Sequence, residues 1–287
     1  MAPRVSSYMS SPVLAVRPTD TLAYARNLML KRGIGRLVVV GDDESLVGII
    51  TLSDISDALV NRFPSRTIDS MLVEEVMTPN PLTIEPTKSI KTAAQLMLKR
   101  RIGGIPVVEP GGGVVGIITR SDIVRAFADK YKGKYTVGEV MRMSFSKAQR
   151  GHSIYYVSRL IQADPAGKVV IVDEDNKPIG VITKRDLVFT DIDVMVASSR
   201  GKDRYVKVKT TRRYADKMIS ARIYITPIAE DIMTPDPIVA RVNDDAATSA
   251  GIMINEGIGI LPVVEDSGSI VGVFTKIEVL TAFVYKG

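Results

Sequence analysis

The chain has 287 residues, a hydrophobic fraction of 45%, a charged fraction of 24% and a formal net charge of +6. This length suits two ordinary domains with cores of their own, and the composition excludes a mainly disordered chain, a collagen and a membrane protein. Cysteine is absent and His152 is the single histidine, so disulfides and cysteine- or histidine-rich metal sites are excluded by count. The first twelve residues lack the apolar stretch of a secretory signal, and we expect a cytoplasmic protein.

A unit of about 60 residues occurs four times in the sequence. Each copy has a methionine near its start and a glycine 39 residues later, in a segment that reads GIITLSD, GIITRSD, GVITKRD or GVFTKIE. The methionine and glycine pairs are Met9 and Gly48, Met77 and Gly116, Met141 and Gly180, and Met233 and Gly272. We therefore assign repeat 1 to residues 1–68, repeat 2 to 69–132, repeat 3 to 133–193, a basic insertion to 194–227 and repeat 4 to 228–287.

The predicted elements follow the same order in every repeat. In repeat 1, apolar residues at Leu22, Ala25 and Met29 have helical spacing, and Gly33 is typical of a helix C-terminus. The β-branched run LVVV at Leu37, with IPVV, VVIV and LPVV in the later repeats, predicts a buried strand. A polar or glycine turn, a second strand of the VGIIT type and a last helix complete each repeat. The predicted core is thus helix, strand, strand, helix, and the fold class is α/β.

These repeats resemble CBS domains, small modules named after cystathionine β-synthase. The matching features are the VMTP segments at Met77 and Met233, the G-I-P-V-V strand and the T-x-x-D junction that follows each second strand. The resemblance covers nearly the whole chain. It implies that the four units pair into two discs, called Bateman modules, with clefts between paired units, in an organisation similar to the γ subunit of AMP-activated protein kinase.

The T-x-x-D junction lies where a strand ends and a helix begins. A helix N-terminus offers unpaired N–H groups and a partial positive charge, which suit a phosphate. The resemblance implies that the aspartate holds ribose hydroxyls and the threonine reaches a phosphate, so that AMP, ADP or ATP is a regulatory ligand and no cofactor is required. The residues implied are Thr51, Asp54, Thr119, Asp122, Thr183 and Asp186. The same pattern is also a capping box, which needs no ligand. Repeat 4 has the longer Glu278 at the aspartate position.

Positive side chains add a second group of candidates. Arg36 and Lys168 stand 27 residues after the methionines of repeats 1 and 3, and Gly104 holds that position in repeat 2. The resemblance implies that a basic residue here contacts phosphate. Arg120, Lys184 and Arg185 lie inside the junction motif and are further phosphate candidates, with Lys276, next to Glu278, as a secondary one. Alternatively, these long cations extend along the surface toward water.

Two other patterns are interpreted as structural. Gly111, Gly113 and Gly116 fit G-x-G-x-x-G, but a dinucleotide site requires that this pattern open a helix. Here it precedes a strand, which predicts a hairpin turn. His152 stands near the start of a helix in repeat 3, where a solvated residue is expected.

The connection between repeats 3 and 4 is at least 24 residues longer than the others and strongly basic. Its segment Arg200–Arg222 has nine Lys or Arg against two Asp, a net charge of +7, so the rest of the chain sums to −1. Cations interleaved with tyrosines are typical of binding to a nucleic-acid backbone, and we predict docking on RNA, with the ribosome as the favoured partner. The candidates are Arg200, Lys202, Arg204, Tyr205, Lys207, Lys209, Arg212, Arg213, Tyr214, Lys217 and Arg222. A solvated linker, an acidic partner protein and the rim of the opposite disc remain alternatives.

The four repeats leave no segment for a catalytic domain, so we expect no enzyme. The first hypothesis is an adenine-nucleotide-sensing regulatory protein that couples translation to energy state. The alternative is a regulatory subunit that controls a partner enzyme or transporter through protein contacts only, like the kinase γ subunit. A structural scaffold with empty clefts is the third. No membrane partner is expected, and a homodimer is left open.

Overall fold

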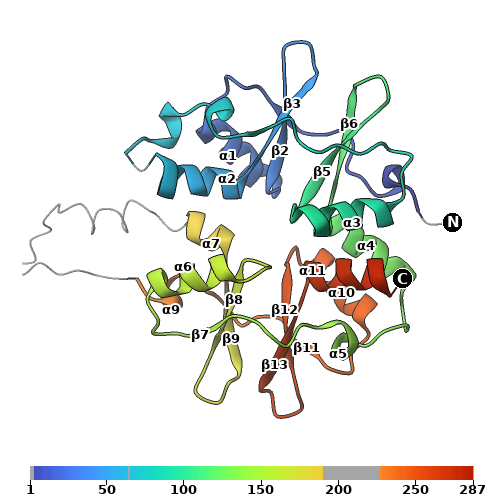
Figure 1. Ribbon diagram of the computed structural model, residues 1–287. Helices are drawn as coiled ribbons and strands as arrows, with labels where there is room; N and C mark the ends of the chain where they lie inside the picture. Colours follow the sequence, from blue (N-terminus) through green and yellow to red (C-terminus); the bar gives the residue numbers. More distant parts are fainter. Residues whose placement is uncertain (1–2, 64, 190–226, 287) are drawn as a thin grey trace, which may run out of the picture. The chain divides into compact units, whose positions relative to one another are not determined.

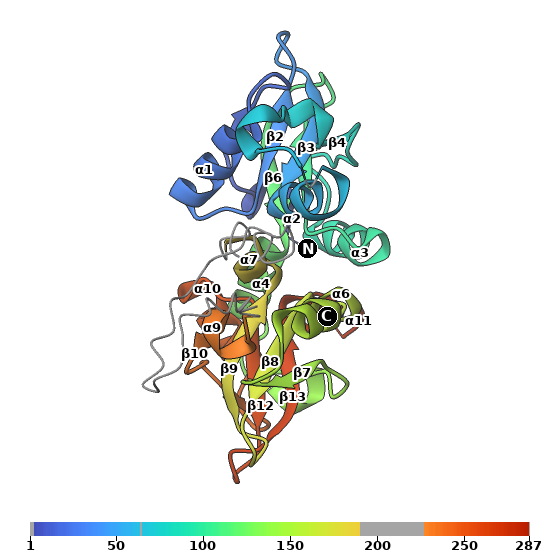
Figure 2. The ribbon, with the colours of Figure 1, turned by 90° about the vertical axis from the view of Figure 1, so that its left-hand side faces the viewer.

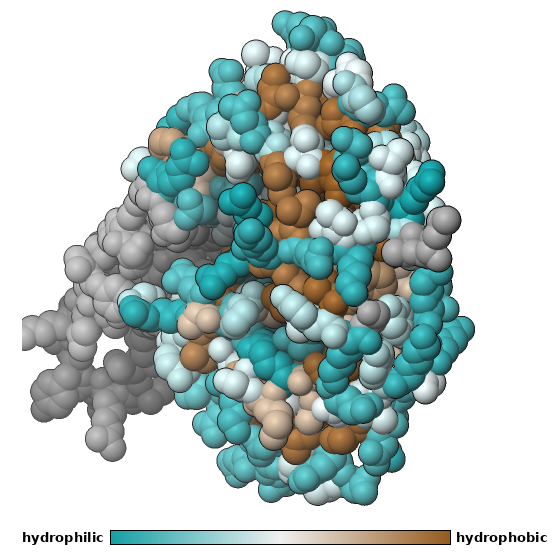
Figure 3. Space-filling model, turned by 45° about the vertical axis from the view of Figure 1, so that its right-hand side comes forward, coloured by the Kyte–Doolittle hydropathy of each residue, from teal (hydrophilic) through white to brown (hydrophobic). Residues whose placement is uncertain are grey.

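A computed structural model describes residues 3–63, 65–189 and 227–286 of the chain. The predicted RNA-binding residues of the basic insertion all lie outside these described ranges. Among the described residues, no helix combines the length and the apolarity that a membrane crossing requires. Figure 3 accordingly shows a surface with many polar side chains, interrupted by apolar patches.

The order helix, strand, strand, helix recurs in all four repeats (Figure 1), as expected for this α/β fold. Repeat 1 contains β1 (Ala15–Val16), α1 (Leu22–Arg32), β2 (Arg36–Val40), β3 (Leu46–Thr51) and α2 (Leu52–Asp57), followed by a π-helical turn η2 (Ala58–Arg62). Repeat 2 contains β4 (Thr78–Pro79), α3 (Ile90–Arg100), β5 (Gly104–Val108), β6 (Val114–Thr119) and α4 (Arg120–Lys130). Short 3₁₀ turns lie near the starts of the two repeats, as η1 (Val5–Ser7), η3 (Ile68–Ser70) and η4 (Val73–Glu75).

The same order recurs in the second half of the chain. Repeat 3 contains α5 (Val137–Val140), β7 (Lys147–Gln149), α6 (Ile154–Ala163), β8 (Lys168–Val172), β9 (Pro178–Thr183) and α7 (Lys184–Phe189). Repeat 4 contains α9 (Ala229–Ile232), β10 (Thr234–Pro235), β11 (Ala240–Arg241), α10 (Ala246–Asn255), β12 (Ile260–Val264), β13 (Ile270–Thr275) and α11 (Lys276–Tyr285).

Local chemistry sets where the first long helix of each repeat (α1, α3, α6 and α10) begins. Its N-cap side chain accepts a hydrogen bond from the backbone N–H three residues later, which satisfies one of the unpaired donors of the first turn. The four N-caps are Thr21, Ser89, Ser153 and Asp245. At the other end of α1, Gly33 adopts the left-handed conformation with φ 65°, so the predicted stop is confirmed.

The two longer strands of each repeat form an antiparallel hairpin, as β2 and β3 do with Arg36 opposite Thr51. β1, β7 and β11 lie parallel to β2, β8 and β12 respectively. The predicted glycine-rich hairpin turn is confirmed, because it joins β5 to β6 with Gly112 at φ 90°.

Repeats 1 and 2 exchange their starting segments. Met9 packs on Gly116 of repeat 2 and Met77 on Gly48 of repeat 1, not on the glycines of their own repeats. A Cβ placed on Gly48 would lie 2.5 Å from the Met77 sulfur, and one on Gly116 would lie 2.9 Å from the Met9 sulfur. The close approach therefore requires glycine at both positions.

The second half of the chain repeats this exchange. Met141 of repeat 3 packs on Gly272 of repeat 4, while Met233 of repeat 4 packs on Gly180 of repeat 3. In Figure 2, β10 lies beside β9, where Thr234 pairs with Val181. The chain thus couples repeat 1 with repeat 2 and repeat 3 with repeat 4, which is the pairing that two Bateman modules require.

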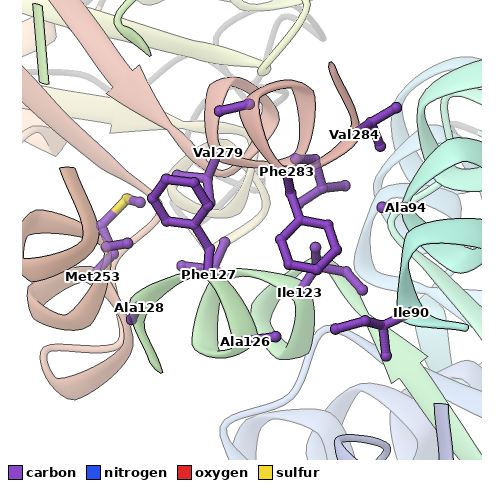
Figure 4. Close-up of a cluster of buried hydrophobic side chains, with 14 of the residues drawn as sticks. Ile90, Ala94, Ile123, Ala126, Phe127, Ala128, Met253, Val279, Phe283 and Val284 are labelled. Atoms are coloured by element: carbon purple, nitrogen blue, oxygen red, sulfur yellow. The ribbon is translucent and has the colours of Figure 1, made fainter. Parts of the chain in front are cut away.

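The chain also divides into two compact units, and this division does not follow the pairing of the repeats. One unit comprises Met1–Phe145, Glu174–Pro178 and Asp236–Gly287, and the other comprises Ser146–Asp173 and Ile179–Pro235. Repeats 1, 2 and 4 therefore share the first unit, and the core of repeat 3 makes up the second. The reason lies in the helices, because α10 and α11 of repeat 4 pack on α4 of repeat 2. In Figure 4, Phe127 of α4 points toward Val279 of α11, and Phe283 of α11 lies over Ile123 of α4.

Candidate functional site

Each T-x-x-D junction forms the predicted capping box. Asp54 Oδ2 accepts hydrogen bonds from the Thr51 backbone N–H at 2.8 Å and from the Thr51 hydroxyl at 2.7 Å. The corresponding distances are 2.8 and 2.7 Å for Thr119 and Asp122, and 2.7 and 2.8 Å for Thr183 and Asp186. The aspartate thereby holds the first turn of the helix, whose N-terminus carries a partial positive charge.

The capping box uses only one oxygen of each carboxylate. In repeat 1 the other oxygen, Asp54 Oδ1, has no hydrogen-bond partner among the described residues, and the side chain is half-buried. A ribose needs such a carboxylate oxygen, accessible yet fixed in direction. The geometry at Asp54 is therefore compatible with the ribose role that the resemblance implies.

Arg36 lies over the second repeat. Its guanidinium packs on Gly103 and Gly104, where a Cβ placed on Gly103 would come within 2.6 Å of Arg36 Nη2. Because Arg36 and Gly104 hold the same position in repeats 1 and 2, equivalent positions meet, and only one of them can carry a long side chain. Burial, reinforced by Arg120 and opposed by Asp122 and Asp54, lowers the pKa of Arg36 to about 10.

Two further cations approach Arg36 from other repeats. Arg120 is the first residue of α4, and its Nε is the one buried side-chain nitrogen or oxygen without a hydrogen-bond partner in the part of the chain that the structure describes. Lys276 is the first residue of α11 in repeat 4, and its Nζ donates to Ser121 Oγ at 2.8 Å. We call Arg36, Arg120 and Lys276 the cation cluster.

The cation cluster lies in a poorly solvated place next to three carboxylates. Burial lowers the pKa of Arg120, and the nearby Glu278 opposes this shift. Burial also lowers the pKa of Lys276, with further lowering by Arg36 and Arg120 and opposition from Asp122. Cations grouped in this way are suited to bind an anion such as a phosphate.

The acid of repeat 2 is much less accessible than that of repeat 1. Asp122 is 2% exposed. Its Oδ1, the oxygen that the capping box does not use, forms an ion pair with Arg125 Nη1 at 3.5 Å. Burial raises the pKa of Asp122, whereas Thr119, Arg125 and Arg36 oppose the rise. A ligand reaches this carboxylate only if the surrounding cations move.

The acid of repeat 4 is fully engaged. Glu278 Oε2 accepts hydrogen bonds from the Thr275 N–H at 3.0 Å and from the Thr275 hydroxyl. Its other oxygen, Oε1, accepts from Arg142 Nε at 3.1 Å. The capping box predicted for repeat 4 is therefore present, and both oxygens of the longer acid have protein partners.

The candidates of repeat 3 lie together in the second unit. Asp186 is half-buried, and Lys184 packs on Gly167, where a Cβ would lie 2.9 Å from Lys184 Cε. Lys168 begins the neighbouring strand β8 directly after Gly167. Like repeat 1, repeat 3 thus combines a junction threonine and aspartate with a cation at the start of the neighbouring strand.

His152 takes the structural role expected for it. Its Nδ1 accepts a hydrogen bond from the Gln149 N–H at 2.9 Å, and its ring lies 4.8 Å from that of Tyr156. Among the described residues, no group of three metal-ligating side chains occurs.

Sequence reasoning missed two contributors, Ser121 and Arg142. Lys276 was a secondary candidate, because it directly follows the junction threonine of repeat 4, as Arg120 and Lys184 do in their repeats, but stands next to Glu278. Arg142 had no such signal within its own repeat, because it contacts the acid of another repeat.

A family profile for the CBS domain matches residues 5–61, 73–129, 137–192 and 229–285, which together form most of the chain. The chain belongs to the CBS domain family. The four matched segments correspond to the four repeats, so the family resemblance is confirmed for each CBS repeat.

Two proteins match this chain over nearly its whole length. Uncharacterized protein MJ1225 of Methanocaldococcus jannaschii is 26% identical over 283 residues, which are 94% of this chain and 95% of that protein. Its crystal structure, described as that of a candidate archaeal homologue of g-AMPK, matches with a TM-score of 0.76 at 24% identity and covers 98% of this chain and 100% of that one. An uncharacterized conserved protein from Pyrococcus horikoshii matches with a TM-score of 0.67 at 21% identity over 98% and 100% of the two chains. These likenesses establish a common fold.

Some similar CBS proteins are enzymes. Inosine-5′-monophosphate dehydrogenase of Korarchaeum cryptofilum is 34% identical over 121 residues, which are 42% of this chain and 23% of that enzyme. The likeness therefore covers less than a quarter of the enzyme, and it gives this chain no catalytic function.

Proposed function

We propose that this chain is a non-catalytic regulatory protein that binds adenine nucleotides at the junctions of its CBS repeats. The observation that carries the proposal is the cation cluster, in which the buried Arg120 Nε has no partner among the described residues. Asp54 and Asp122 lie close enough to this cluster for both carboxylates to oppose the lowering of the pKa of Arg36. A nucleotide supplies what this site needs, because its ribose donates to a carboxylate and its phosphates offer several anionic acceptors.

The repeat 1 junction is the first site we assign, with Thr51, Asp54, Arg36 and Arg120. The repeat 3 junction, with Thr183, Asp186, Lys168 and Lys184, is the second, because its acid is also half-buried. Binding at the repeat 2 junction, with Thr119 and Asp122, requires that Arg36, Arg125 and Lys276 rearrange around the buried carboxylate. We therefore expect it to be the weakest of the three.

Calorimetric titration of the full chain with AMP, ADP and ATP tests this assignment. We expect Asp54→Ala to remove one binding event and Asp186→Ala another. Asp57→Ala is the matched control, because Asp57 lies on the same short helix as Asp54 and is exposed. Heat from none of the three nucleotides, or equal loss in the control, would contradict the proposal.

The second part of the proposal concerns the basic insertion, which docks on RNA and couples translation to the nucleotide state. Its support is the net charge of +7 between Arg200 and Arg222 with Tyr205 and Tyr214 interleaved. Deleting 200–222 should abolish co-sedimentation with ribosomal subunits at moderate salt, and binding of the intact chain should fall steeply as salt rises. A variant with these nine cations changed to glutamine separates the effect of charge from that of length.

The alternative function is a regulatory subunit that acts on a partner enzyme or transporter through protein contacts alone. Affinity capture of the full chain from its own cells, with and without ribonuclease, separates the two. A partner protein that stays bound after ribonuclease treatment, with no RNA in the eluate, would favour the alternative.

A further inference from the structure

The four repeats place one residue in the same position beside each junction. It is the residue after the starting methionine, and it pairs with the strand residue two positions before the junction threonine of the coupled repeat. Ser10 thus faces the repeat 2 junction, Thr78 that of repeat 1, Thr234 that of repeat 3 and Arg142 that of repeat 4. Three of these residues are small hydroxyl residues, and the fourth is arginine.

The repeat 4 junction differs from the other three both in the residue that faces it, Arg142, and in its acid, Glu278. Repeats 1, 2 and 3 combine serine or threonine at this position with an aspartate in the junction, whereas repeat 4 combines Arg142 with Glu278. The longer acid reaches the longer base, and Arg142 Nε lies 3.1 Å from Glu278 Oε1. The side chains of Arg142 and Glu278 are 22% and 8% exposed, so the ion pair is largely shielded from water.

The guanidinium occupies the carboxylate oxygen that the proposed function assigns to a ribose in the aspartate junctions. The capping box uses Glu278 Oε2, and Arg142 takes Oε1, the counterpart of the oxygen that is free in Asp54. A second hydrogen bond, from Arg142 Nη1 to the Ser144 carbonyl oxygen at 2.6 Å, holds the guanidinium in this place. We propose that Arg142 is a built-in occupant of the repeat 4 junction, which closes that junction to nucleotide and limits the chain to the aspartate junctions.

This inference rests on the proposed nucleotide function and makes a separate prediction about stoichiometry. Native mass spectrometry and calorimetry with AMP, on the full chain, count the bound equivalents. Glu278→Gln keeps an oxygen acceptor for the capping box and should leave the number of AMP molecules unchanged. Loss of one equivalent would show that Glu278 holds a nucleotide and would overturn the inference, while the function at the aspartate junctions would stand.

The converse variant reopens the junction. Arg142→Ser with Glu278→Asp gives repeat 4 the residues that repeat 2 already has in Ser10 and Asp122, so both substitutions are tolerated in a folded CBS repeat of this chain. We expect the double variant to bind one more AMP than the natural chain, and Glu278→Asp alone, with Arg142 retained, to bind no more. An unchanged count in the double variant, with an unchanged thermal unfolding midpoint, would overturn the inference.

The two proposals fail in different ways. If the natural chain binds no AMP, the proposed function fails. One equivalent gained by the double variant would still establish closure by Arg142, whereas none gained would overturn it as well.

Discussion

Arg36 and Gly104 show how one residue of a repeat fixes the identity of its counterpart. They occupy equivalent positions, they meet between repeats 1 and 2, and the guanidinium fills the space that a side chain at Gly104 would need. Burial of the arginine then brings its charge next to Asp54 and Asp122. Two arginines at these equivalent positions would clash, so repeats 1 and 2 must carry different residues where they meet.

We predict that Gly104→Ala destabilises the chain by about 1–3 kcal/mol, the usual cost of overpacking a filled site. Arg36→Ala in the same chain should remove most of that cost, because the added methyl group then meets no guanidinium. Urea unfolding of the two single variants and the double variant measures the coupling. Additive effects of the two substitutions would contradict the contact.

The lowered pKa of Lys276 predicts how nucleotide affinity depends on pH. Only the protonated amine attracts phosphate, and its charge is lost as pH rises through the pKa. Because that pKa lies below the ordinary value of 10.5, affinity for AMP should fall at an alkaline pH at which an ordinary lysine is still charged. Lys276→Arg keeps its charge to a higher pH and should shift this fall upward. Identical pH profiles of AMP affinity for the natural chain and the Lys276→Arg variant would exclude a role of Lys276 in AMP binding.

At the scale of elements, the starting segments of the repeats have an unexpected role. The first residues of repeat 1 pack with repeat 2, where Val5 is fully buried in the core and Ser10 pairs with Ile117 of β6. The first residues of repeat 2 likewise join repeat 1 through β4, where Thr78 pairs with Ile49. The starting segment of each of these two repeats therefore pairs with the hairpin of the other repeat and not with its own.

This exchange gives a prediction for hydrogen exchange. Met9→Ala should increase amide exchange in β6 (Val114–Thr119) of repeat 2 more than in β3 (Leu46–Thr51) of repeat 1, although Met9 belongs to repeat 1 in sequence. Met77→Ala is the matched variant and should show the reverse order. Loss of protection in the repeat to which each methionine belongs would contradict the exchange.

At the scale of the whole chain, one core joins repeats that are distant in sequence. Residues of α3 and α4 in repeat 2 and of α10 and α11 in repeat 4 belong to a single buried cluster. Small residues such as Ala126 and Ala250 allow the helices to approach closely, and Phe127 stacks on Tyr131 at 4.9 Å between ring centroids. This core brings Lys276 and Glu278 of repeat 4 to the Arg120 of repeat 2.

We predict that Phe127→Ala costs about 3–5 kcal/mol, as expected for a large buried aromatic side chain. Because the core is shared, repeats 2 and 4 should lose protection together. Guanidinium unfolding measures the cost, and hydrogen exchange in β5 and β12 locates it. Leu37→Ala, in the separate core of repeat 1, is the control, and selective loss in repeat 2 alone would contradict a shared core.

The sequence by itself determined the features that depend on neighbouring residues. Helix starts, the stop at Gly33, the hairpin turn near Gly112 and the capping boxes all arise from chemistry within a few positions along the chain. The equal spacing of four methionines and four glycines was sufficient to define the repeats, and the resemblance to CBS domains then placed Arg36 and Asp54 among the site candidates.

Only the tertiary structure decided which repeats meet. A methionine 39 residues before one glycine packs on another glycine, Asp122 is buried, and Arg142 reaches an acid 136 positions away. Equivalent repeats carry nearly the same local signals, so the sequence pattern cannot distinguish contact within a repeat from contact with another. Packing distinguishes them, because a glycine, an acid or a cation has one set of neighbours in the folded chain, and those neighbours determine whether a junction is open or closed.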